Sequence, residues 1–95
     1  MATIKLVVEM PDGEASFLLS GQDAIVGRDD HADLVIESAM VSRRHGFFKA
    51  GPLGYTFSDM GSSNGSAHLS VGSTQPVRVA PGAPVPLQDG DTLWL

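Results

Sequence analysis

The sequence predicts an all-β fold, a sandwich or barrel of short strands, on three observations. Short stretches rich in β-branched and aromatic residues recur along all 95 residues. Turn-forming residues, including 11 glycines and 6 prolines, separate these stretches at short intervals. No window of about ten residues keeps a helical period without meeting a glycine or a proline. Frequent turns between short apolar runs are typical of all-β domains.

The first four expected strands follow from alternation and from the turns between them. Residues 3–10 alternate roughly and are rich in β-branched side chains. The turn residues Pro11-Asp12-Gly13 lead into residues 14–19, which predicts an N-terminal hairpin. A second turn precedes the apolar residues 24–26, and a polar loop separates these from the brief apolar run 34–36.

Six further strands are expected in the rest of the chain. Residues 46–50 and 55–58 flank the turn residues Gly51-Pro52-Leu53-Gly54 and are expected to pair with each other. A loop rich in glycine and serine follows. Beyond it, Gly-Ser, Pro-Gly and Asp-Gly turn signals delimit the last expected strands, at residues 66–71, 76–80, 83–87 and 92–95.

Length and composition bound the function classes. Residues 1–95 are expected to form a single domain, and a hydrophobic fraction of 42% argues against disorder. A net charge of −5 disfavours binding to nucleic acid or to an anionic membrane surface. There is no cysteine, no apolar run near the roughly 18 residues of a membrane span and no signal-peptide pattern, so a cytoplasmic location is expected. The 3 histidines are widely spaced, so neither a metal nor a cofactor is expected.

Three polar loops carry the chemistry that the composition leaves open. Ser42-Arg43-Arg44-His45 places a hydroxyl beside two guanidinium groups, which suits an anionic group from outside. Gly27-Arg28 ends a strand, and Ser62-Ser63-Asn64-Gly65 offers hydroxyls, an amide and a glycine free to take a positive φ. Only 6 residues are Lys or Arg, and three of them lie in these loops.

Each motif alone has a simpler structural explanation. Arg28 alone resembles a solvated surface arginine, and Ser42 could cap a turn. For His45 the structural explanation is the better one, an imidazole that binds loop backbone. Residues 62–65 alone resemble an ordinary hairpin loop. Together, however, the hydroxyls and the guanidinium suit a phosphate dianion, and the amide of Asn64 suits the backbone of an extended peptide.

Taken in chain order, Gly27-Arg28, then Ser42-Arg43-Arg44-His45, then Ser62-Ser63-Asn64-Gly65, the three motifs resemble the signature of the forkhead-associated (FHA) domain. Asp59 precedes the third motif, and Leu87-Gln88-Asp89-Gly90-Asp91 resembles a late Leu-x-x-Gly-Asp turn of the family. The resemblance implies a two-sheet β-sandwich of mostly antiparallel strands, whose loops at one end bind phosphothreonine peptides.

The resemblance also implies a role for each matching residue. Arg28 and Ser42 resemble the phosphate contacts, and Arg43 resembles a residue that supports the phosphate or the peptide backbone. Ser63 matches a position that donates to the phosphate or supports the binding loop, and Asn64 matches the residue that brackets the peptide main chain. Structural support of the site is implied for four residues, Gly27, Asp33, His45 and Gly65. Arg44 occupies a variable position and is expected to face solvent.

Two departures from the family pattern lead to further expectations. Ser66 stands where the family usually has threonine after Asn-Gly, a change that keeps the hydroxyl. Family members usually continue past the strand matching residues 92–95 with a final strand beside the first one. We therefore expect a domain that lacks this strand or was cut from a longer chain. Residues 3–10 should then have an unsatisfied edge, a site for a strand-exchanged or edge-paired dimer.

The function expected from this resemblance is a phosphothreonine-peptide-binding module that recruits phosphorylated partner proteins in Ser/Thr kinase signalling. The alternative is a phosphate-independent protein–protein interaction scaffold with the same fold. An enzyme is not expected: Ser42, His45 and Asp59 could be drawn as a triad, but the sequence has no nucleophile elbow. Acidic and apolar residues beside the motifs, Asp29 and Asp30 among them, predict an apolar or basic preference downstream of the phosphothreonine.

Overall fold

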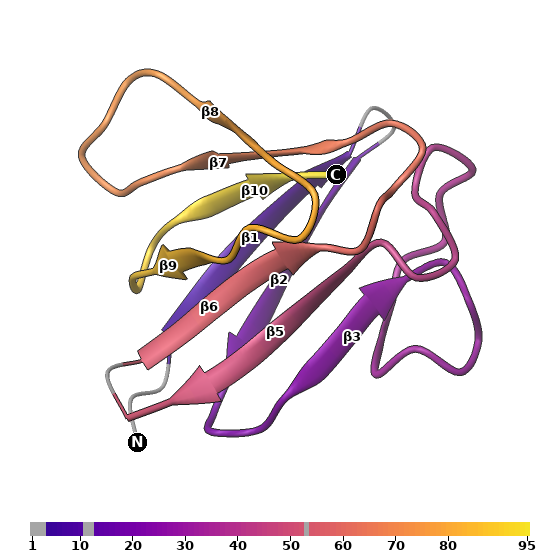
Figure 1. Cartoon of the computed structure of the whole chain (residues 1–95), viewed down its shortest axis with the longest axis horizontal. Coiled ribbons are helices and arrows are strands. Elements are labelled where there is room, and N and C mark those ends of the chain that lie inside the picture. The colour runs from indigo at the N-terminus through magenta and orange to yellow at the C-terminus, as the bar shows by residue number, and fades with distance from the viewer. Residues whose placement is uncertain (1–3, 11–12, 53) are drawn as a thin grey trace.

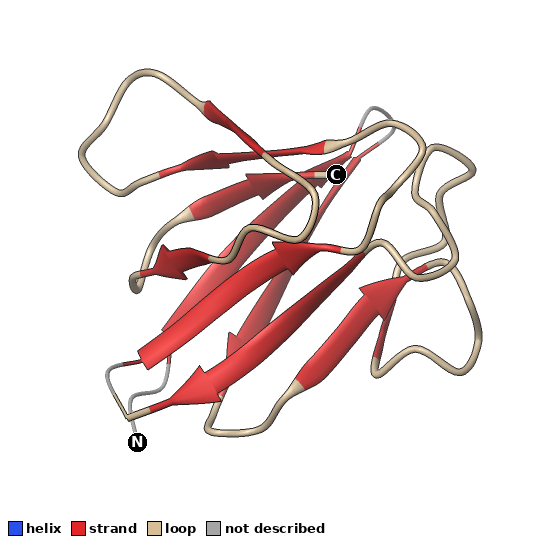
Figure 2. Ribbon diagram, in the orientation of Figure 1, coloured by secondary structure: helices blue, strands red, loops and turns tan. Residues whose placement is uncertain are grey.

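The chain folds into two β-sheets packed face to face, as the computed structural model shows (Figure 1). The structure describes residues 4–10, 13–52 and 54–95. Within these residues every regular element is a strand, and the rest is loop and turn (Figure 2). No helix in this part of the chain is long and apolar enough to cross a membrane. The predicted all-β sandwich is confirmed.

In the described part of the chain, ten strands fall into two sheets of five. The first sheet has the order β2-β1-β10-β7-β8 and the second the order β4-β3-β5-β6-β9. Described neighbours pair antiparallel, except for the parallel pairs β1–β10 and β3–β4. The strands are β1 (Ile4–Met10), β2 (Gly13–Leu19), β3 (Ala24–Gly27), β4 (Leu34–Val35), β5 (Gly46–Gly51), β6 (Gly54–Asp59), β7 (Ser66–Leu69), β8 (Val77–Val79), β9 (Val85–Leu87) and β10 (Thr92–Trp94).

Alternating residues from both sheets form the core between them. Leu6 of β1 and Leu93 of β10 are fully buried in the first sheet, and Phe48 and Phe57 are fully buried in the second. The rings of Phe48 and Phe57 face each other across β5 and β6, with centroids 5.2 Å apart. Burying a large apolar side chain contributes about 1.5–3 kcal/mol, so this core fixes the register of both sheets.

Up to β6 the strand boundaries agree with the sequence prediction to within one residue, whereas the strands of the C-terminal part are shorter than expected. Residues 66–71 were expected to be extended, but β7 ends at Leu69 because a turn begins at Ser70, whose carbonyl accepts a hydrogen bond from Ser73 N. The turn predicted at Pro11 and Asp12 lies outside the described residues, and so does Leu53 of the next hairpin.

The predicted free edge of the first strand was wrong. Strand β1 lies between β2 and β10, and Val7, Val8 and Glu9 pair in parallel with Thr92–Trp94. Unpaired backbone groups in a strand are costly, and β10 satisfies those on the second side of β1. The dimer was predicted from a free edge of β1, and this edge is paired with β10, so the structure gives no ground for that prediction.

Three loops gather at one end of the sandwich, on the right in Figure 1. They follow β3, precede β5 and follow β6, so they contain the three polar motifs of the sequence. Antiparallel pairing of β5 with β3 and β6 places the start of β5 beside the ends of both neighbours. Sheet topology thus brings together loops that are far apart in the sequence.

Candidate phosphopeptide-binding site

The loops after β3 and before β5 are joined through backbone hydrogen bonds. Arg28 N donates to the Ser42 carbonyl at 3.0 Å, and Asp29 N donates to the Arg43 carbonyl at 3.1 Å. Only glycine fits at position 27: a Cβ there would lie 2.0 Å from the Arg43 carbonyl oxygen. This close approach sets Arg28 beside Arg43.

The two arginines line a cavity of about 270 Å³ together with Asp29 and Asp30. Arg28 is exposed, and its Nε donates to the Val41 carbonyl at 3.1 Å, which orients the guanidinium. Within the described part of the chain, each ion pair involves a histidine, so neither arginine is neutralised by a carboxylate. The cavity therefore presents guanidinium groups that an external anion can pair with.

Asp29 in the cavity lining is held by its own loop rather than by Arg28 or Arg43. Its carboxylate accepts from His31 N at 2.9 Å and lies 3.3 Å from His31 Nδ1. The hydrogen bond from the His31 backbone, with the nearby imidazole, holds the pKa of Asp29 below its usual value. Asp29 is thus ionised and adds a negative charge to the cavity lining.

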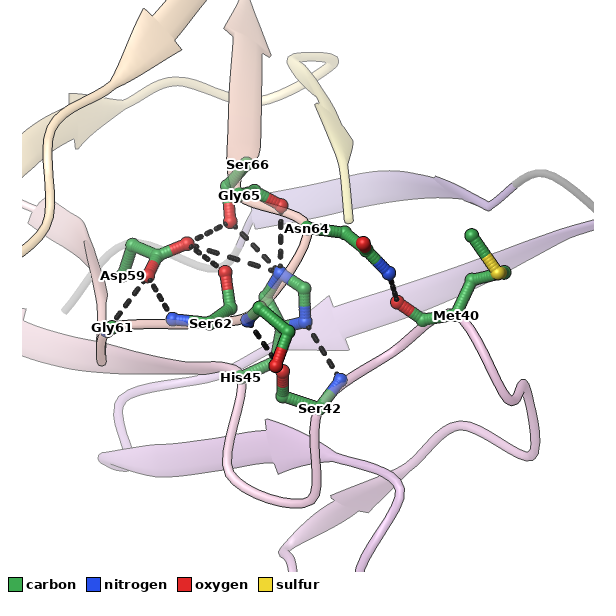
Figure 3. A network of polar contacts seen from close by, with 10 residues as sticks. Met40, Ser42, His45, Asp59, Gly61, Ser62, Asn64, Gly65 and Ser66 are labelled. Carbon is green, nitrogen blue, oxygen red and sulfur yellow. Dashed lines mark hydrogen bonds and ion pairs between the residues drawn. The ribbon is translucent and has the colours of Figure 1, made fainter.

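His45 is the buried junction between two of the loops (Figure 3). Its Nδ1 accepts from Ser42 N at 3.1 Å, and its Nε2 lies 3.0 Å from both the Gly65 carbonyl and Ser66 Oγ. An Nδ1 that accepts from an amide carries no proton, so the hydrogen of the neutral ring is on Nε2. Burial lowers the pKa of His45, although Gly65 and Asp59 act in the opposite direction. The neutral ring fixes Ser42 relative to the loop after β6.

We expect folding stability to decrease as the pH falls below about 6.5, the ordinary pKa of histidine. In this range His45 takes up a proton in the unfolded chain but not in the folded chain. The free energy of unfolding therefore falls by up to about 1.4 kcal/mol per pH unit. The loss continues until the pH passes the lowered pKa of folded His45. Urea unfolding between pH 7.5 and 5 measures it.

Comparison with two single variants isolates His45 in that experiment. His45→Gln should be less stable at pH 7.5 but should lose the decrease below pH 6.5. His31→Gln removes an exposed histidine and should still show the decrease in stability below pH 6.5. Equal pH dependence in the wild type and in His45→Gln would contradict the assignment.

Asp59 organises the loop after β6. Strand alternation places Tyr55, Phe57 and Asp59 on the buried face of β6, so the carboxylate is 1% exposed. Its Oδ1 accepts from Gly61 N and Ser62 N at 2.8 Å each (Figure 3). Its Oδ2 accepts from the hydroxyls of Ser62 and Ser66. Burial acts to raise the pKa of Asp59, but these hydrogen bonds outweigh burial and hold the pKa below its usual value.

Sequence reasoning gave Asp59 a place in the motif order but no role in the fold. The signal was present: an aspartate two and three residues before Gly61 and Ser62 is typical of a turn that its side chain closes. The hydroxyl kept at Ser66 is the second part of this network, because it contacts both His45 and Asp59.

The loop after β6 contacts the Ser42 loop directly. Ser63 N donates to Ser42 Oγ at 2.9 Å, which leaves the Ser42 hydroxyl hydrogen free to donate elsewhere. The amide of Asn64 donates to the Met40 carbonyl at 2.7 Å (Figure 3). One N–H and the oxygen of this exposed amide remain for a ligand. Ser42, Ser63 and Asn64 therefore lie side by side at one end of the sandwich.

Not every candidate residue lies at this end. Asp33 precedes β4, and its carboxylate accepts from Ile25 N at 2.8 Å, so it braces β4 against β3 away from the arginines. Arg44 is exposed, as expected for a solvent-facing residue. The described residues contain no group of three His, Asp or Glu side chains that could hold a metal ion.

A sequence model of the FHA domain family matches residues 24–95. The chain belongs to the FHA family. No curated protein sequence matches it. The matched residues contain all three polar motifs and eight of the ten described strands, since β1 and β2 precede residue 24.

Solved structures share the fold. One is Mycobacterium tuberculosis EmbR in complex with a low-affinity phosphopeptide, with 26% identity and a TM-score of 0.68. That match covers 99% of this chain but only 22% of the EmbR chain. An FHA domain of an Arabidopsis thaliana hypothetical protein has 23% identity and a TM-score of 0.68, over 96% of this chain and 72% of its own. A structure from a study of phosphothreonine-dependent FHA domain interactions has 22% identity and a TM-score of 0.62, over 97% and 85%.

Proposed function

We propose that this FHA domain binds phosphothreonine peptides and thereby recruits phosphorylated partner proteins in Ser/Thr kinase signalling. The observation that carries the proposal is the set of unneutralised guanidinium groups of Arg28 and Arg43 beside the hydroxyl of Ser42. The EmbR complex with a phosphopeptide and the study of phosphothreonine-dependent FHA interactions support it by family relationship.

The proposed complex assigns each exposed group one task. The free Nη groups of Arg28 and the Ser42 hydroxyl bind the phosphate, which at neutral pH carries about −1.5 to −2 charge. Arg43 adds a second cation at the same cavity, and Ser63 donates to the phosphate or supports the loop. The amide of Asn64 brackets the peptide backbone. These groups bind and do not transform the ligand, so the domain acts as an interaction module without a cofactor. We further propose that it does so in the cytoplasm.

Replacing Arg28 with alanine should weaken phosphopeptide binding by about one to two decades. A charged hydrogen bond contributes roughly 1.5–3 kcal/mol, and about 1.4 kcal/mol corresponds to a decade in Kd. Calorimetric titration with a phosphothreonine peptide library measures the change, and Arg44→Ala serves as a control of equal charge with an expected effect below about threefold.

The same titration separates the proposal from a phosphate-independent scaffold. If binding requires the phosphate, the wild-type domain should not bind the unphosphorylated peptide pool, and Arg28→Ala should bind the phosphorylated pool much more weakly than the wild type does. Equal binding of the phosphorylated and unphosphorylated pools would contradict the proposal and favour the scaffold.

A further inference from the structure

A second groove lies beside the phosphopeptide-binding loops, on the outer face of the first sheet. It has a volume of about 340 Å³ and is lined by Asn64, Gly65, Ala67, Pro76, Arg78 and Trp94 among others. Asn64 and Gly65 belong to the loop after β6, so the groove begins where the candidate site ends.

Strand register explains the shape of the groove. Ala67 of β7 pairs with Trp94 of β10 on one side and with Arg78 of β8 on the other. Residues directly opposite in antiparallel strands project from the same face, so the small alanine leaves a channel between indole and guanidinium. Gly65 closes the near end, because a Cβ there would lie only 3.0 Å from Arg78 Nη2. The guanidinium therefore lies against the binding loop.

Arg78 has no partner of opposite charge among the residues that the structure describes. It is exposed, and it is one of only 6 Lys and Arg residues in a chain of net charge −5. A guanidinium with its donors free beside an aromatic wall suits an anionic group on an extended chain.

We propose that this groove binds an acidic residue of the same phosphopeptide, with its anionic group on Arg78. The proposal rests on the proposed function of the neighbouring loops. A carboxylate or a second phosphate offers the required oxygens. The peptide stem between the anion and the phosphothreonine then crosses Asn64 and contacts Trp94.

The distance to the phosphate site limits where the acidic residue stands. Ser63 N is 2.9 Å from Ser42 Oγ, and Gly65 is two residues further along the loop, at most about 8 Å away. An extended peptide advances about 3.3–3.6 Å per residue, so the acidic residue is within about four positions of the phosphothreonine. Asp29 and Asp30 line the cavity with Arg28 and Arg43, so the preference for an acidic residue applies only to the arm of the peptide that reaches Arg78.

A peptide scan on the intact domain tests this inference. The parent peptide has a central phosphothreonine and no other charged side chain, and is called the neutral peptide below. Glutamate, phosphothreonine or glutamine is placed at one position at a time, from four residues before to four residues after the central phosphothreonine. We expect glutamate to tighten Kd by about fivefold at one or two adjacent positions on one arm. Arg78→Gln should remove this gain, and Lys49→Gln, an equal charge loss at an exposed site in β5, should keep it.

Each outcome decides the inference. A larger gain from the second phosphate than from glutamate would identify a doubly phosphorylated partner, and the reverse an acidic one. A glutamate gain that survives in Arg78→Gln, or no gain at any position, would overturn the inference while binding of the neutral peptide leaves the proposed function intact. If the wild-type domain does not bind the neutral peptide at all, both this inference and the proposed function are overturned.

Discussion

Replacing Gly27 with alanine should destabilise the domain by about 3 kcal/mol and weaken phosphopeptide binding by at least about tenfold. The added Cβ would lie 2.0 Å from the Arg43 carbonyl oxygen and 2.7 Å from the Arg43 carbonyl carbon. Both are backbone atoms, so no side-chain rotation can relieve the overlap. The two loops must separate, and the hydrogen bonds from Arg28 N and Asp29 N lengthen or break with them.

Urea unfolding and calorimetric titration of the same variant measure both effects. Gly51→Ala is the matched control: its Cβ would meet its nearest neighbour, the Gly54 carbonyl oxygen, at an ordinary 3.4 Å. We expect Gly51→Ala to change stability by less than about 1 kcal/mol and to leave affinity unchanged. A Gly27→Ala domain as stable as Gly51→Ala would show that the loops can separate without cost.

The strands could be predicted from the sequence because they depend on local signals, and the grouping of the polar loops because the motif order resembles a family pattern. Alternation around Phe48 and Phe57, together with glycine and proline turns, marks the strands of each hairpin. The order of the motifs at Arg28, Ser42 and Asn64 then indicated a common family pattern. The structure brings these residues to one end of the sandwich.

Long-range pairing could not be predicted from such signals. The parallel pairing of Val7–Glu9 with β10 depends on which strand fills the second side of β1, and no local pattern encodes this choice. The groove at Arg78 has the same origin, because Ala67 meets both Trp94 and Arg78 only through the registers of β7. Sequence reasoning accordingly missed Arg78.

The partners of buried polar groups were likewise hidden in the sequence. His45 was expected to bind loop backbone, but its bond to Ser66 Oγ requires the end of β6 and the start of β7 to meet around Asp59. An aspartate in a polar loop usually faces solvent, whereas strand alternation buries this one.

Replacing Asp59 with alanine should therefore be the most destabilising single change at the site, by about 3–5 kcal/mol. The carboxylate accepts from Gly61 N, from Ser62 N and Oγ, and from Ser66 Oγ, and it is 1% exposed. Its removal leaves several donors without an acceptor, each at a cost of about 1–3 kcal/mol where water cannot replace it. The loop carrying Ser63 and Asn64 should then lose its fixed position, and phosphopeptide affinity should fall with stability.

Asp89→Ala is the matched control, because Asp89 is exposed and its carboxylate accepts a single backbone hydrogen bond, from Lys5 N. It should cost about 1 kcal/mol in urea unfolding and leave binding unchanged. Asp59→Asn should fall between the two, since it keeps one accepting oxygen but turns an amide toward the hydroxyls of Ser62 and Ser66. An Asp59→Ala domain that binds phosphopeptide with wild-type affinity would show that the His45 bonds to Gly65 and Ser66 suffice to hold the loop, and would leave Asp59 a role in stability alone.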